Sequence, residues 1–199
     1  MEVNISKFKL YIHTAKFFSN VDGLLSLINK LVGERDFIVV INENNSWLRE
    51  QVDEKGVTLG DFSRESADGI LIIDNQHNSE KKQIDECKKI GVPTRVVTLV
   101  LAGLSNKKKG EPYDVFIGRG SIYGNPYSVK EIGSRDEVIR MHEYDFERGL
   151  LNKCDEIKAS LGAMEGAALG CYCSPMRCHG EVYVRYINSN SWRKIKNFV

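Results

Sequence analysis

The alternation of strand-like and helix-like segments in the first half constrains the fold of this chain most strongly. Two continuous apolar runs, 37–41 (FIVVI) and 69–73 (GILII), are typical of strands buried on both faces of a parallel sheet. Apolar spacing and end signals predict further strands over 7–13 and 94–100 and helices over 22–31, 46–55 and 79–90. Strands separated by helices predict βαβ units with right-handed crossovers. We therefore expect an α/β fold with a Rossmann-like parallel sheet in the first half.

The second half predicts a smaller α/β unit. Ser134 and Glu137 form a capping-box pattern at the start of a helix over 134–150. A strand over 167–173 and a helix over 177–187 follow, and the two halves either share one sheet or build separate ones. The polar segment 105–112 (SNKKKGEP) predicts a boundary between domains 1–104 and 105–199. It is equally compatible with a hairpin loop between strands over 96–101 and 113–117.

Charge, apolar run length and cysteine count argue against a nucleic-acid-binding, membrane-spanning or disulfide-rich secreted protein. The formal net charge is +1, which gives no global attraction to nucleic acid. No apolar run has the length of a membrane span, and the N-terminus lacks the pattern of a secretory signal. An odd cysteine count of five, with three clustered, argues against a disulfide framework. We expect a cytoplasmic protein with reduced thiols, as a monomer or an oligomer.

The segment 170–180 (GCYCSPMRCHG) concentrates the reactive side chains. Cys171, Cys173, Cys178 and His179 could supply the four ligands of a tetrahedral zinc site. Alternatively, Cys178 and His179 begin a helix, where amide dipoles favour a thiolate, and act as nucleophile and acid or base. A third reading makes the cysteines small packing residues. The residues alone leave these three readings open.

A glycine-rich loop, 118–126 (GRGSIYGNP), follows the strand predicted over 113–117 and is the second candidate site. It lies at the carboxyl end of that strand, where open α/β sheets bind ligands. Arg119 offers a planar fork that matches phosphate or carboxylate, Ser121 a hydroxyl, and Asn125 a polar edge. Tyr123 could stack on a base. By contrast, His142 and Glu143 lack metal-ligand spacing and are expected on the surface.

Three ordered motifs carry a resemblance to a known family. GRGSIYGNPY (118–127), GSRDEV (133–138) and GCYCSPMRCHGEV (170–182) resemble the phage and bacterial family named domain of unknown function 4326. The resemblance covers roughly 113–188 and implies the anatomy of the second half. The family name carries no established activity.

The first half, over 62–97, is similar to the later part of SLOG-type Rossmann-like nucleotide-binding domains. That resemblance implies a phosphate loop after the second strand. Here the corresponding segment 41–50 (INENNSWLRE) contains no glycine, so close approach of backbone amides to phosphate is harder. We expect a degenerate, scaffold-like domain.

Together these features predict a protein that handles a nucleotide or nucleoside, held between the loop 118–126 and the turn 171–179. Its chemistry would be transfer or hydrolysis, with Cys178 and His179 as the acting groups. The alternative is a non-catalytic, phage-type accessory protein that sequesters a nucleotide signal or binds a host protein. Its cysteines would then be structural, with or without zinc.

Overall fold

The computed structural model describes residues 7–76 and 79–189 and divides them into two compact units. The boundary between the units falls between Val100 and Leu101. The chain therefore changes units before the polar segment 105–112, which lies inside the second unit. Each unit has its own sheet, so the option of one shared sheet is not the one realised. The fold is α/β, as predicted.

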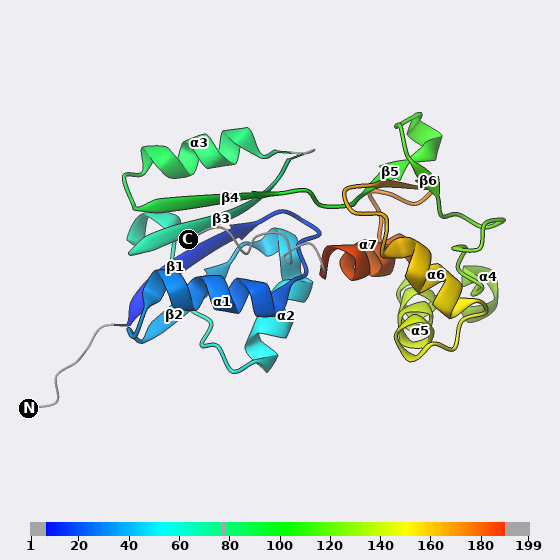
Figure 1. Ribbon diagram of the computed structural model, residues 1–199, viewed down its shortest axis with the longest axis horizontal. Helices are drawn as coiled ribbons and strands as arrows, with labels where there is room; N and C mark the ends of the chain where they lie inside the picture. Colours follow the sequence, from blue (N-terminus) through cyan, green and yellow to red (C-terminus); the bar gives the residue numbers. More distant parts are fainter. Residues whose placement is uncertain (1–6, 77–78, 190–199) are drawn as a thin grey trace, which may run out of the picture. The chain divides into compact units, whose positions relative to one another are not determined.

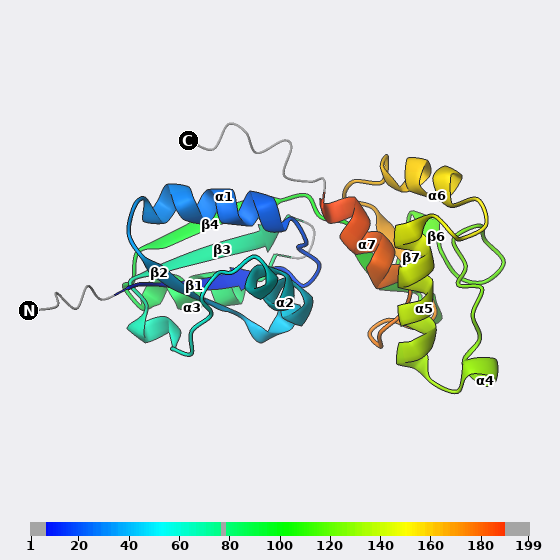
Figure 2. The same cartoon turned by 90° about the horizontal axis from the view of Figure 1, so that it is seen from below.

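The first unit is a four-stranded parallel sheet in the order β2-β1-β3-β4. Its strands and helices are β1 (Phe8–Thr14), α1 (Val21–Val32), β2 (Phe37–Ile41), α2 (Ser46–Glu54), β3 (Gly69–Asn75), α3 (Lys81–Lys89) and β4 (Thr94–Leu99). Every residue of β3 is buried, which agrees with the continuous apolar run that predicted this central strand. The helices α1 and α3 lie on opposite faces of the sheet (Figures 1 and 2).

The second unit is built around a three-stranded parallel sheet in the order β5-β7-β6. Its elements are β5 (Gly103–Asn106), β6 (Val115–Phe116), α4 (Val129–Ile132), α5 (Arg135–Arg148), α6 (Cys154–Leu161), β7 (Ala168–Cys171) and α7 (Gly180–Ser189). The hairpin reading of 105–112 is wrong, because β4 and β6 belong to different sheets. A short 3-10 turn, Lys107–Lys109, occupies the middle of this segment.

The helix α7 approaches the sheet closely at its first residue. A Cβ atom on Gly180 would lie 2.6 Å from Cδ1 of Ile117 and 2.7 Å from Cδ2 of Leu104. Only a residue without a side chain fits there without displacing these two side chains. Glycine at this position therefore seats the end of the cysteine-rich turn directly against β5 and the residue that follows β6.

No helix among the described residues is both long and apolar enough to cross a bilayer.

Candidate active site

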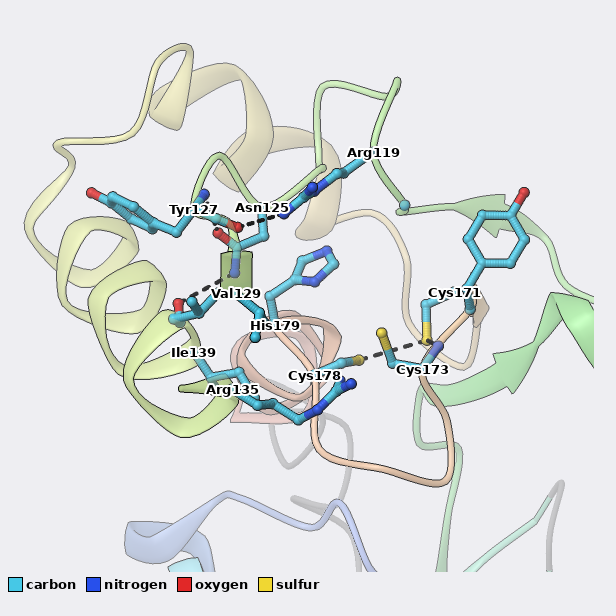
Figure 3. Close-up of a pocket in the computed structure, with 13 residues that line it drawn as sticks. Arg119, Asn125, Tyr127, Val129, Arg135, Ile139, Cys171, Cys173, Cys178 and His179 are labelled. Atoms are coloured by element: carbon cyan, nitrogen blue, oxygen red, sulfur yellow. Dashed lines mark hydrogen bonds between the residues drawn. The ribbon is translucent and has the colours of Figure 1, made fainter. Parts of the chain in front are cut away.

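A single pocket of about 260 Å³ in the second unit gathers most of the predicted site residues (Figure 3). Six of the eight line it: Arg119, Asn125, Cys171, Cys173, Cys178 and His179. They come from the glycine-rich loop and from the cysteine-rich turn, two segments about fifty residues apart in the sequence. The remaining lining residues come from α4, α5 and their flanks: Tyr127, Val129, Arg135, Val138 and Ile139, with Gly118 and Tyr172 completing the wall.

Asn125 anchors the glycine-rich loop to α5. Its buried side chain donates from Nδ2 to the carbonyl of Val138, 3.3 Å away, and its Oδ1 accepts from the backbone N–H of Tyr127 at 2.8 Å. Arg119 is exposed, and its Nη2 donates to the carbonyl oxygen of Tyr127 at 2.7 Å. This contact commits one of the five N–H donors of the guanidinium group. The loop thus holds Arg119 in a defined place while leaving donors for another partner.

Two predicted ligand contacts, Ser121 and Tyr123, do not line the pocket. The Ser121 hydroxyl donates to the carbonyl of Gly118 at 2.8 Å and closes the turn of the loop. The Tyr123 hydroxyl donates to Oγ of Ser160, 3.0 Å away. Both hydroxyls therefore serve the internal structure of the second unit.

The three thiols of the turn take different roles. Cys171, the last residue of β7, accepts hydrogen bonds from the backbone N–H groups of Cys173 and Ser174, each 3.4 Å from its sulfur. The Sγ of Cys178 lies 3.6 Å from the same sulfur. Both Cys171 and Cys178 are buried, while Cys173 is half-buried. The chain folds back so that a nest of donors surrounds the Cys171 sulfur.

These contacts separate the pKa values of the two sulfurs. The hydrogen bond from Cys178 lowers the pKa of Cys171 to about 6, helped by the two backbone N–H groups and opposed by burial. The pKa of Cys178 is raised well above its ordinary value, because its proton is held by Cys171 and because it is buried. Cys171 is therefore the thiolate of the pair, and Cys178 is its proton donor. In the catalytic reading of the sequence Cys178 is the nucleophile, whereas these contacts favour Cys171 for that role.

His179 turns its ring away from the sulfur atoms (Figure 3). Its Nε2 lies 2.9 Å from the carbonyl oxygen of Ile117, to which it donates. Burial lowers the pKa of this imidazole, and the carbonyls of Ile117 and Tyr123 act in the opposite direction. Among the residues that the structure describes, no group of three or more His, Cys, Asp or Glu side chains is placed to hold a metal ion. The predicted four-ligand zinc set is not assembled in this structure.

Arg135 is a pocket residue that the sequence analysis missed. It is the first residue of α5, and its Nη1 donates to the carbonyl of Arg177 at 3.2 Å. The only signal was its position directly after the helix cap Ser134, whose Oγ accepts from the N–H of Glu137. The position of a side chain one residue into a helix depends on what the helix packs against, so that signal did not indicate a pocket.

His142 is fully buried, so the expected surface position is wrong. Its Nε2 lies 3.0 Å from the hydroxyl oxygen of Tyr183, which itself donates to the carbonyl of Tyr123 at 3.0 Å. The ring of His142 meets that of His179 edge-on, with centroids 5.2 Å apart. Burial, with a smaller effect of His179, lowers the pKa of His142 to about 3. This neutral imidazole belongs to the core behind the pocket.

In the first unit, two buried asparagines of the glycine-free segment 41–50 form hydrogen bonds with other parts of the unit. The Oδ1 of Asn42 accepts from the N–H of Thr14 at 2.9 Å. Asn45 caps α2 by accepting from the N–H of Leu48 at 3.2 Å, and its Nδ2 donates to the carbonyl of Phe18 at 2.7 Å. These buried amides hold the segment after β2 against the end of β1 and the loop that follows it.

His13, at the carboxyl end of β1, is also buried, and its Nε2 lies 2.6 Å from Oε2 of Glu80. It lines a separate polar pocket of about 520 Å³ in the first unit.

Comparison with known proteins assigns the second half to a family. Residues 104–189 match the family described as Domain of unknown function (DUF4326). The chain is 40% identical over 89 residues to an uncharacterised 12.4 kDa protein in the nrdA-td intergenic region of Enterobacteria phage T4. That alignment covers 44% of this chain and 79% of the phage protein. No solved structure matches the chain. The resemblance predicted for the second half is confirmed, and the SLOG resemblance of the first half stays a prediction.

Proposed function

The chain belongs, through residues 104–189, to the DUF4326 family, and from this premise we propose that its second unit binds a small nucleotide-like anion in the pocket between the glycine-rich loop and the cysteine-rich turn. The anionic group lies against Arg119 and Arg135. The Cys171 thiolate faces the ligand as the reacting group, and the chemistry is transfer or hydrolysis at a nucleotide or nucleoside.

The hydrogen-bonding state of Arg119 and Arg135 is the observation that carries this proposal. Neither Arg119 nor Arg135 makes an ion pair with a carboxylate among the described residues, and the side chain of each donates one hydrogen bond, to a backbone carbonyl. Their neighbours differ, since Arg140 pairs with Glu137 at 2.6 Å and Arg177 pairs with Asp136 at 3.0 Å.

The pocket wall contains no Asp or Glu. Two guanidinium groups beside a pocket without a carboxylate favour an anion, because their planar forks match phosphate and carboxylate oxygens.

The rest of the wall fits the organic part of such a ligand. Val138 and Ile139 are buried and present apolar surface from α5, and Val129 adds to it from α4. Tyr127 and Tyr172 also line the pocket. Ligand sites typically combine a mainly apolar wall with a few placed polar groups. A base or sugar against these side chains would leave the phosphate to the arginines.

The thiolate supplies the chemistry. The Cys171 sulfur would attack an electrophilic carbon or phosphorus atom of the ligand, the leaving group would depart with its bonding electrons, and water or a second acceptor would release the product. His179 lines the same pocket and, because burial lowers its pKa, is uncharged at neutral pH. We therefore assign the attack to Cys171 and keep His179 as a group that orients the ligand. A non-catalytic protein that sequesters the nucleotide is the alternative.

A ligand panel tests the proposal. Nucleoside 5′-monophosphates and the matching nucleosides are added to the whole protein, binding is measured by calorimetry, and each ligand is then recovered and analysed by mass spectrometry. We expect binding of nucleotides and weak or no binding of the uncharged nucleosides. Chemical change that disappears in Cys171→Ser indicates an enzyme, whereas ligand recovered intact indicates a sequestering protein. Equal binding of nucleosides and nucleotides would contradict the anion site.

A further inference from the structure

The two buried sulfur atoms of the turn stand in contact with each other. Cys171 Sγ and Cys178 Sγ are 3.6 Å apart, and both residues are at most 2% exposed. A disulfide requires about 2.05 Å between sulfurs. The two chain segments place the sulfurs side by side (Figure 3), so the sulfurs must approach each other by about 1.5 Å to form the bond.

The surroundings of the pair favour attack by one sulfur and resolution by the other. The N–H groups of Cys173 and Ser174 point at the Cys171 sulfur and stabilise it as an anion. The Cys178 sulfur has one backbone N–H group acting on it among the described residues, that of Gly180, and it lies where a second thiol is needed to close the bond. Both residues line the pocket, which is the route by which a reagent as small as a peroxide would reach them.

We propose that Cys171 and Cys178 form a reversible dithiol–disulfide couple in the pocket, oxidised by hydrogen peroxide or a similarly small peroxide. The Cys171 thiolate attacks one peroxide oxygen, the O–O bond breaks, and hydroxide leaves, so that Cys171 becomes a sulfenic acid. The Cys178 sulfur then attacks the Cys171 sulfur, the S–O bond breaks, and water leaves. Together, two thiols and one hydrogen peroxide give one disulfide and two waters. A dithiol reductant restores both thiols by exchange.

The couple changes the charge of the pocket. In the reduced state the Cys171 sulfur carries a negative charge, and in the disulfide that charge is absent, while Arg119 and Arg135 keep theirs. Oxidation thus removes the nucleophile and leaves the anion-binding groups. Bond formation itself does not depend on the nucleotide proposal, and it can be measured on the protein without any ligand.

The chain offers a direct way to map the bond. Trypsin cleaves after Lys158, Arg177 and Arg185, which places Cys171 and Cys173 in one peptide and Cys178 in the next. A Cys171–Cys178 disulfide therefore links two tryptic peptides, whereas a Cys171–Cys173 bond stays inside one. The whole protein is treated with hydrogen peroxide, the remaining thiols are blocked, and the digest is analysed by mass spectrometry with and without dithiothreitol.

We expect the linked pair of peptides in the native protein, lost on reduction with dithiothreitol. Cys173→Ser is the matched control, because this half-buried thiol shares the turn, and it should form the link as well. Cys178→Ser should instead accumulate a sulfenic acid on Cys171 that dimedone traps. Absence of the link in native and Cys173→Ser protein with normal thermal melting, or a bond between Cys171 and Cys173, would overturn the proposal.

Discussion

Nε2 of His142 lies 3.0 Å from the hydroxyl oxygen of Tyr183, in the core behind the pocket. Because the Tyr183 hydroxyl donates to the carbonyl of Tyr123, it accepts a hydrogen bond from Nε2–H of His142, which leaves Nδ1 as the unprotonated nitrogen. That nitrogen has no hydrogen-bond partner among the described residues. The second unit therefore requires a neutral imidazole at this position.

This requirement predicts a loss of stability in acid. The pKa of His142 is lowered to about 3 in the folded protein, against an ordinary value of 6.5. The unfolded chain thus binds the proton more readily, and the unfolding free energy falls as the pH drops below 6.5. Between pH 7 and pH 5 the loss from this residue is about 2 kcal/mol. Urea unfolding at both pH values measures it, with His142→Gln as the comparison. A variant with the same pH dependence as the native protein would contradict the assignment.

The Cys171 thiolate predicts a distinctive alkylation profile. Iodoacetamide reacts with the thiolate form, so the rate at Cys171 should rise through a midpoint near pH 6 and level off above it. Replacing the proton donor, in Cys178→Ala, should move this midpoint to higher pH. Peptide mass spectrometry after short exposures resolves Cys178 from the Cys171 peptide, and Cys173→Ser removes the second thiol of that peptide. A midpoint near pH 8.5, the value of an ordinary cysteine, would refute the thiolate assignment.

We expect the substitution Gly180→Ala to lower the stability of the second unit through a steric clash. The added methyl group of Gly180→Ala would press on Ile117 and Leu104, and overpacking of this kind costs about 1–3 kcal/mol. Gly103→Ala is the matched control in the same unit, since a Cβ there meets nothing within 4 Å. Thermal unfolding of the two variants should show a clear loss for position 180 and little change for position 103. Equal stability of both variants would contradict this overpacking, because α7 or the ends of the Ile117 and Leu104 side chains would then shift at no cost.

Asn45 tests the scaffold role of the first unit. Asn45→Ala removes the cap of α2 and the bond to Phe18, and loss of a cap costs about 1 kcal/mol. We expect lower stability with unchanged binding of nucleotides. The exposed Glu50→Ala, on the same helix, serves as the control. A nucleotide affinity that falls with Asn45→Ala at full stability would restore a SLOG-type site in the first unit.

The elements that local sequence determines were predictable. Apolar runs located β2 and β3, and Ser134 located the start of α5. The strand β5, with sequence GLSN, was missed because its pairing with β7 comes from tertiary context rather than from its own residues.

The same limit applies to the site. The loop and turn were found from residue types, but the role of Cys171 depends on the N–H groups of the turn and on Cys178, and no sequence spacing reveals their orientation. The burial of His142 was not predicted for the same reason, because it depends on what α5 packs against.

The affinity of the protein for a nucleoside 5′-monophosphate in Arg119→Lys tests the central claim most directly. Lysine keeps the charge and loses the fork, and a charge-assisted hydrogen bond contributes about 1.5–3 kcal/mol, so affinity should fall by roughly 10- to 150-fold. Arg140→Lys is the control, because Arg140 is exposed and paired with Glu137. Calorimetry should show the loss for Arg119→Lys alone, with both variants as stable as the native protein. Unchanged affinity in Arg119→Lys would contradict the anion site.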